Sequence, residues 1–176
     1  MMPEIGHFAL IIAFCLTLML ATVPAWGAWR GNAVAMSLAP TLAIGILVFV
    51  GISFGCLASA FLQDDFSVAL VAAHSNSLLP PIYKFAAVWG NHEGSLMLWA
   101  LILALWTAAV ALFSPQLPLL VLSRVLSVMG AIGVGFLSFS LVTSNPFARL
   151  LPGIPDDGGD LNPLLQDPGL IIHPPL

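Results

Sequence analysis

Four long apolar stretches follow one another along the chain, separated by polar or proline-containing positions. They cover about 8–26, 38–61, 96–113 and 119–142, and each approaches the roughly 20 residues that a helix needs to cross a bilayer. Arg124 is the one charged residue inside them, and it lies near enough to an end to place its guanidinium in the membrane interface. The pattern predicts an all-α membrane protein with four transmembrane helices.

Polar positions gather in two segments outside these stretches. A loop over 63–92 separates the second and third stretches, and a proline-rich tail over 144–176 follows the fourth. The expected organisation is a four-span bundle over 1–143, which includes the loop, and a tail that leads toward a further span absent from the sequence.

Two short helices are predicted within the loop. Asp65 can cap a helix over 66–73. Pro81 suits the first turn of a second helix, because proline is favoured where no backbone donor is needed. Apolar residues with helical spacing occur there: Ile82, Phe85, Ala86 and Trp89. This second helix is amphipathic, so it could lie on the membrane surface or under a partner.

Small residues recur at intervals of four in three of the spans. Such stripes let helix backbones approach closely in lipid, where burying apolar surface gives no net drive for association. They are predicted to mark packed helix faces, and they consist of Ala9, Ala13, Thr17 and Ala21, then Gly51, Gly55 and Ser59, then Ser123, Ser127, Ala131 and Gly135.

Composition supports the membrane class. The chain is 60% hydrophobic and only 7% charged, with a mean hydropathy of +1.05, whereas soluble domains carry about 25% charged residues. The formal net charge is −4 and no basic patch occurs, so a nucleic-acid partner is not expected. Cys15 and Cys56 both fall inside spans, so they are interpreted as small buried hydrophobes.

The distribution of basic residues predicts an orientation. The first seven residues include Glu4 but no Lys or Arg, and Arg30 follows the first span. The positive-inside tendency therefore favours an N-terminus outside, and Arg124 near an inner span end agrees. Lys84 and Arg149 would then lie outside, so the basic residues are evenly divided between the two sides. Four spans then put the loop and the tail outside as well.

One sequence pattern matches an enzyme motif by accident. Residues 51–55 read Gly-x-Ser-x-Gly, which in lipases requires a turn between a strand and a helix to expose the serine. Here the pattern lies in the middle of a span, so it does not predict an esterase.

The histidines are the residues best able to bind a metal, because a neutral imidazole is the commonest protein ligand. His7, His74, His92 and His173 all lie at or beyond span ends on the outer side. A structural role beside Glu93 is favoured for His92. His173 precedes two prolines, which hold it in an extended conformation and present its imidazole at the membrane surface. From the residues alone, both a ligand and a structural role remain open for it.

Several blocks of the sequence resemble the CcmF family, which provides the haem lyase of cytochrome c maturation systems. The blocks are residues 3–10, 65–68, 74–77, 89–95, 143–147, 160–170 and 173–175, and their sequences are PEIGHFAL, DFSV, HSNS, WGNHEGS, TSNPF, DLNPLLQDPGL and HPP. The resemblance covers almost the whole chain.

The resemblance implies a role for named residues. His173 matches a periplasmic histidine that ligates the haem iron, and His74, Trp89, His92 and Glu93 could line the same site. The implied cofactor is haem, with a b-type haem in the complete assembly. The implied partners are the remaining CcmF segments, the haem chaperone CcmE, CcmH and CcmI, apocytochrome c and membrane lipids. The implied location is the bacterial inner membrane, rather than the mitochondrial one, with the N-terminus and tail periplasmic.

The chain also departs from that family. CcmF is a longer multi-span protein, and the tryptophan-rich WWD segment, the second periplasmic histidine and two intramembrane histidines have no counterpart here. We therefore expect an N-terminal portion of a haem lyase that is not active by itself. Two alternatives stay open: a non-enzymatic scaffold or channel subunit, and the paralogous lyase for nitrite-reductase-type cytochromes.

Overall fold

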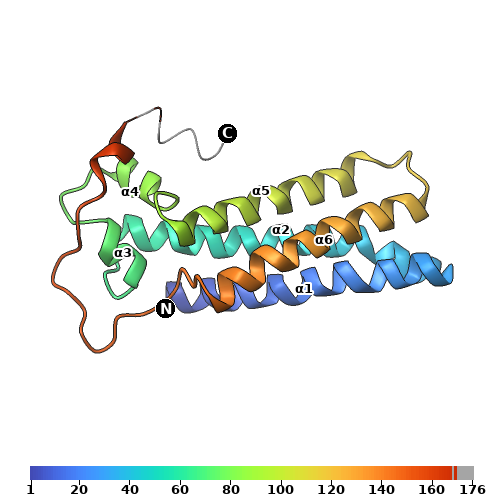
Figure 1. Ribbon diagram of the computed structural model, residues 1–176, viewed down its shortest axis with the longest axis horizontal. Helices are drawn as coiled ribbons and strands as arrows, with labels where there is room; N and C mark the ends of the chain where they lie inside the picture. Colours follow the sequence, from blue (N-terminus) through green and yellow to red (C-terminus); the bar gives the residue numbers. More distant parts are fainter. Residues whose placement is uncertain (168, 170–176) are drawn as a thin grey trace.

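Four long helices lie side by side and form the body of the molecule (Figure 1). The computed structural model describes residues 1–167 and residue 169. The long helices are α1 (Met2–Arg30), α2 (Ala33–Leu62), α5 (His92–Phe113) and α6 (Leu119–Val142), and each is long and apolar enough to cross a membrane. No strand occurs within the described residues, so the all-α, four-span class is confirmed.

The first two helices extend beyond the predicted apolar stretches at both ends. With 29 residues, α1 is about 43 Å long, which exceeds the roughly 30 Å hydrocarbon core of a bilayer. A sharp turn then separates it from α2. Gly31 ends α1 in the left-handed conformation, with φ of 70°. Asn32 caps α2, because its side chain accepts a hydrogen bond of 3.1 Å from the Ala35 amide.

The predicted small-residue stripes pack in two of the three spans. In α1, Ala9, Ala13 and Thr17 are buried against neighbouring helices. In α6, Ser123 and Ser127 are buried, although Gly135 has open space where a Cβ would stand. The α2 stripe is largely unpacked within the described residues: nothing lies within 4 Å of a Cβ added at Gly51 or Gly55, so the structure does not confirm that part of the prediction.

A layer of short helices and loops covers the end of the bundle where the chain begins (Figure 1). It contains α3 (Ala69–His74), α4 (Pro81–Ala87), the tail after α6 and a short 3-10 helix, η1 (Pro163–Gln166). Pro81 begins α4, as predicted. The exposed Ile82 and Phe85 lie on one side of α4, while Ala86 and Ala87 are buried.

The predicted cap of the first loop helix is wrong. The α3 helix begins at Ala69, and its N-cap residue is Val68, which makes no side-chain capping bond. Asp65 instead accepts a hydrogen bond from the Ser67 hydroxyl and pairs with Arg149 of the tail. The aspartate is therefore used to join two distant segments.

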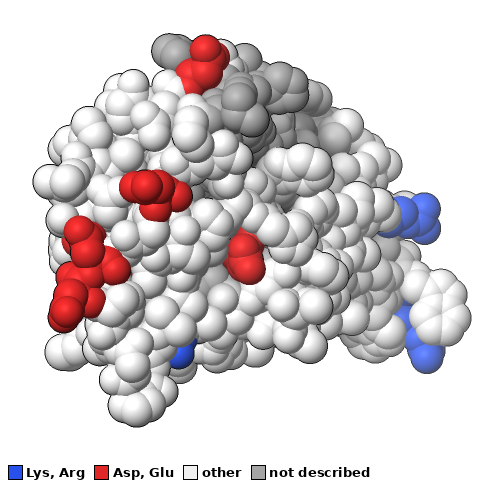
Figure 2. Space-filling view, turned by 60° about the vertical axis from the view of Figure 1, so that its left-hand side comes forward, with Lys and Arg blue, Asp and Glu red and all other residues white. Residues whose placement is uncertain are grey.

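Acidic side chains are spread over this end of the molecule. Figure 2, in which this end comes forward, shows Asp and Glu across it, while most of the Lys and Arg colour lies on the far end. The two cations of the layer are paired: Lys84 is buried with its Nζ 2.5 Å from Asp64, and Arg149 contacts Glu4 and Asp65.

Candidate functional site

The candidate site residues that the structure describes all lie in or next to the layer, but they do not come together in one site. His74 ends α3, and its Nδ1 is 3.1 Å from the Leu70 carbonyl oxygen. Trp89 follows α4, with its ring edge-on to Phe85 at 5.1 Å between centroids. His92 and Glu93 begin α5. Across the described residues no group of three His, Cys, Asp or Glu side chains is placed to hold a metal. His173 lies outside the described residues.

His92 connects the start of α5 to the end of α6. Its Nδ1 lies 3.1 Å from the Ser144 hydroxyl, within hydrogen-bond distance. Its ring stands edge-on to Phe139, with 5.7 Å between centroids. The imidazole also lines a groove of about 380 Å³, together with Leu96, Ile132, Gly135, Phe136 and Phe139. The polar partner of His92 is thus Ser144, whereas Glu93 lies in the first turn, where its charge is favourable to the helix dipole.

The turn that begins α5 requires a glycine. The Asn91 side chain caps the helix by accepting from the Gly94 amide at 2.6 Å. The Ser95 hydroxyl donates to the Trp89 carbonyl over 2.7 Å. A Cβ added at Gly94 would stand 1.5 Å from the Val88 carbonyl oxygen. The block over residues 89–95 is therefore a tightly closed turn, which fixes Trp89 and His92 relative to each other.

Arg149 joins three segments that are far apart in the sequence. Its Nη2 is 2.8 Å from a Glu4 carboxylate oxygen at the start of α1. Its Nη1 is 3.4 Å from an Asp65 oxygen and donates to the Ser67 hydroxyl. Reasoning from the sequence missed this cluster, because nothing in the local pattern pairs a tail arginine with residues that precede it by more than 80 positions.

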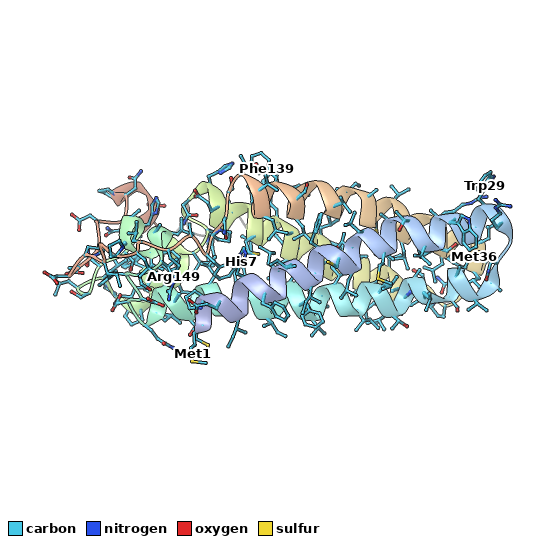
Figure 3. All side chains as sticks on the ribbon, turned by 90° about the horizontal axis from the view of Figure 1, so that it is seen from below. Met1, His7, Trp29, Met36, Phe139 and Arg149 are labelled. Atoms are coloured by element: carbon cyan, nitrogen blue, oxygen red, sulfur yellow. The ribbon has the colours of Figure 1, made fainter. Side chains whose placement is uncertain are left out.

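A crevice of about 360 Å³ lies between α1 and the tail. Its lining includes His7, Phe147 and Arg149. The His7 ring stands edge-on to Phe147 at 6.3 Å. Figure 3 shows His7 on α1 and Arg149 on the tail at the same end of the bundle, opposite Trp29 and Met36. His7 therefore belongs to the contact between α1 and the tail.

The distal part of the tail is bonded to the loop. The carboxylate of Asp157 accepts hydrogen bonds from the Ser77 amide at 2.9 Å and the Ser77 hydroxyl at 2.8 Å. These bonds, with one from the Gly158 amide, hold the pKa of Asp157 below its ordinary value, and Lys84 adds a smaller favourable charge. The carboxylate is therefore stabilised in its ionised form.

Comparison with known proteins identifies the family to which the chain belongs. The model of the family described as Cytochrome C assembly protein matches residues 89–176. CcmF of Pseudomonas aeruginosa is 62% identical over the whole chain, and CcmF of Escherichia coli K12 is 52% identical. NrfE of Haemophilus influenzae, a cytochrome c-type biogenesis protein, is 45% identical over the whole chain. The chain spans 27% of the length of either CcmF relative and 28% of NrfE.

A solved structure has the same fold. It is described as Cytochrome c Heme Lyase CcmF, and it matches with a TM-score of 0.78 and 23% identity over 87% of this chain and 26% of its own. The chain thus belongs to the cytochrome c assembly protein family. Within that family it matches the N-terminal part of CcmF, which confirms the resemblance drawn from the sequence blocks.

Proposed function

We propose that this chain forms the N-terminal part of a CcmF-type haem lyase. It would help to bind periplasmic haem delivered by CcmE and to attach it to the Cys-x-x-Cys-His motifs of apocytochrome c. One observation carries the proposal: the 62% identity with the P. aeruginosa CcmF extends over all 176 residues. The chain spans about a quarter of that protein. In the proposal, the lyase activity therefore requires the complete protein, and this part alone does not supply it.

His173 is the proposed axial ligand of the haem iron. A neutral imidazole suits iron, and the two prolines after His173 restrict its backbone. Haem supplies the reactive group, and the protein contributes binding and orientation. His74, Trp89, His92 and Glu93 line the approach to this site in the proposal; the hydrogen bond of His92 to Ser144 supports a role in holding the surrounding helices.

The described residues do not fit a resident b-type haem. That group would need a ligand pair within the membrane, whereas His7, His74 and His92 stand at three separate places near the layer. We therefore assign the b-type haem, as a cofactor, to the remaining CcmF segments. The other proposed partners are CcmH, CcmI and membrane lipids.

The proposed location is the bacterial inner membrane, with the N-terminus, loop and tail in the periplasm. The charges support this orientation. All eight acidic residues lie at the layer end or in the loop and tail segments, namely Glu4, Asp64, Asp65, Glu93, Asp156, Asp157, Asp160 and Asp167. Two of the four basic residues, Arg30 and Arg124, lie next to the opposite ends of α1 and α6 from the layer, as the positive-inside rule expects for the cytoplasmic side. The other two, Lys84 and Arg149, lie in the layer, where each pairs with acidic side chains.

A hybrid protein tests the proposal. This chain would replace the matching N-terminal residues of the P. aeruginosa CcmF, in a host that lacks its own CcmF. Covalent haem on a c-type cytochrome would then be measured by in-gel peroxidase activity. Restored maturation that depends on His173 supports the lyase. Indifference to His173 favours the scaffold or channel alternative, and maturation of nitrite-reductase-type cytochromes alone favours the paralogous lyase.

A further inference from the structure

The crevice between α1 and the tail changes from polar to apolar along its length. The α1 residues that line it include Glu4, His7, Phe8 and Ile11, and their spacing of three, four and seven positions places them on one face of the helix. At 1.5 Å per residue, Ile11 lies about 10 Å along the helix axis from Glu4. The crevice therefore has a polar end at the start of α1 and an apolar end two turns further into the span.

The polar end holds charges of both signs close together. The Arg149 guanidinium pairs with Glu4 at 2.8 Å, and the two side chains are 27% and 57% exposed. The Met1 ammonium, which is fully exposed, also lies 3.0 Å from a Glu4 carboxylate oxygen. The carboxylate of Glu4 can thus accept from a primary ammonium while it pairs with Arg149.

Two nitrogen atoms at the polar end have no hydrogen-bond partner among the described residues. They are Nδ1 of His7 and Nε of Arg149, and both atoms are buried from solvent. Their residues lie at the same end of the molecule, on α1 and on the tail (Figure 3). Native proteins rarely leave buried polar atoms unpaired, because the lost hydration is not replaced. Imidazole and guanidinium N–H groups both donate, so the crevice suits a ligand that brings acceptor oxygen atoms.

The apolar end of the crevice is open on the lipid-facing side of α1. Phe8 and Ile11 are exposed, although they belong to a helix that is apolar enough to cross a membrane. The tail supplies the buried ring of Phe147 to the same lining. Exposed apolar side chains of a spanning helix contact acyl chains, which are as apolar as they are. From Glu4 to Ile11 the crevice thus has the order of a phospholipid, with the headgroup first and the acyl chain after it.

We propose that this crevice binds one phospholipid with a zwitterionic headgroup, phosphatidylethanolamine. The lipid phosphate accepts from Arg149 and His7, because a guanidinium matches phosphate in shape and charge. The lipid ammonium pairs with Glu4, and an acyl chain lies along Phe8 and Ile11. An anionic headgroup would meet the carboxylates of Glu4 and of Asp65, which also pairs with Arg149, whereas a zwitterion complements both signs.

The bound lipid would connect α1 to the start of the tail, since its phosphate contacts Arg149 from one segment and His7 from the other. This inference goes beyond the proposed lyase function and does not depend on haem. It concerns only residues of the bundle and of the first part of the tail.

The test measures lipid binding to the full-length hybrid protein, purified in mild detergent and stripped of lipid. Dioleoylphosphatidylethanolamine or dioleoylphosphatidylglycerol is titrated in, and native mass spectrometry gives the number of bound lipids and the Kd. We expect one phosphatidylethanolamine to bind about threefold more tightly than phosphatidylglycerol, because the two lipids differ by one exposed ion pair. Soluble phosphorylethanolamine, which lacks acyl chains, should bind far more weakly than the lipid.

Two variants remove the site in different ways. Arg149→Gln takes away the charged partner of the phosphate and should weaken phosphatidylethanolamine binding about tenfold, whereas Arg30→Gln at the other end of α1 should not. Because Arg149 also holds the tail, Ile11→Trp is the second variant: it fills the apolar end and removes no hydrogen bond. It should weaken binding about tenfold as well. Ile44→Trp is its matched control, since Ile44 on α2 is also 39% exposed and lies outside the crevice.

Glu4→Gln tests the choice of headgroup. It keeps the size of the side chain and removes the partner of the lipid ammonium, so the two lipids should bind with equal Kd. Asp156→Asn, at an exposed position of the tail outside the crevice, should leave the preference for phosphatidylethanolamine unchanged.

Several results would overturn the inference. Phosphatidylglycerol bound as tightly as phosphatidylethanolamine by the unmutated protein would contradict a zwitterionic site. Equal Kd values for Ile11→Trp and Ile44→Trp would place the lipid elsewhere, and soluble phosphorylethanolamine bound as tightly as the lipid would exclude a membrane ligand. Cytochrome c maturation is not measured in any arm, so each of these results leaves the proposed function standing, and failure of that function leaves the lipid site standing.

Discussion

The side-chain hydroxyl of Ser53 donates a buried hydrogen bond of 2.8 Å to the backbone carbonyl of Gly6, which joins α2 to α1. Ser53 is the serine of the Gly-x-Ser-x-Gly pattern, and here it is fully buried inside a helix. It therefore serves helix packing. The same close packing requires a glycine at position 6, because a Cβ there would stand 2.5 Å from the Phe147 ring and 2.8 Å from the Cys56 Cβ.

Replacement of Ser53 by Ala should weaken the contact between α1 and α2. Hydrogen bonds between membrane helices contribute about 1 kcal/mol, so the free energy of unfolding in mixed detergent should fall by about that amount. The Ser37→Ala variant is the control, since the Ser37 hydroxyl bonds within its own helix and is exposed. Equal unfolding free energies for the two variants would contradict the interhelical role of Ser53.

Replacement of Gly94 by Ala should be strongly destabilising. The added Cβ would overlap the Val88 carbonyl oxygen at 1.5 Å, and because that neighbour is backbone, the turn before α5 has to open. We expect a loss of about 3 kcal/mol or more in the free energy of unfolding. Gly135→Ala is the matched control: it lies in a helix with open space around it and should change stability by less than about 1 kcal/mol. Similar losses would show that the turn is not closed.

The hydrogen bonds between the distal tail and the loop should persist in mild acid and break in stronger acid. The pKa of Asp157 is lowered by its hydrogen bonds from Ser77 and Gly158. The ionised carboxylate therefore stabilises the contact between tail and loop fully at any pH above the unfolded pKa of about 3.9. This stabilisation is lost as the pH falls through the lower pKa of the folded protein. Hydrogen exchange at Ser77 and Gly159, corrected for the intrinsic pH dependence, measures this. Ser77→Ala should shift the loss to higher pH, and a loss already complete at about pH 5 would contradict the lowered pKa.

The orientation is tested by labelling single cysteines in a background without Cys15 and Cys56. Leu78 is 90% exposed in the layer, and Gln116 is exposed in the turn at the opposite end of the bundle. Leu78→Cys should react with an impermeant thiol reagent added from the periplasmic side, and Gln116→Cys should not. The reverse result would invert the topology.

The sequence was sufficient to predict the four spans and the start of α4, because long apolar runs and a proline in a first helical turn are local signals. It could not predict which faces pack. In a membrane helix the lipid-facing and packed sides are both apolar, so the stripe of Gly51 and Gly55 looks the same as that of Ala9 and Ala13. Only the second is buried.

The contacts between the tail and the loop could not be predicted for a different reason. Asp65 has the local signature of a helix cap, but its partner Arg149 follows it by 84 residues. The bonds from Ser77 to Asp157 have a similar separation of 80 residues. Such contacts form because the bundle brings the loop and the tail to the same end. The local sequence of either segment carries no information about that. The candidate residues that the structure describes, His74, Trp89, His92 and Glu93, do lie at one end of the molecule, but the sequence did not identify their partners.

The proposed role of His173 is tested most directly by His173→Ala in the full-length hybrid protein, with covalent cytochrome c haem measured by in-gel peroxidase activity at equal protein abundance. The expected loss is at least about tenfold, since removal of a metal ligand costs no less than disturbing the shell around it. His7→Ala, which removes the ring contact of α1 with Phe147, should reduce maturation far less. Unmutated levels of covalent haem in the His173→Ala protein would contradict the account.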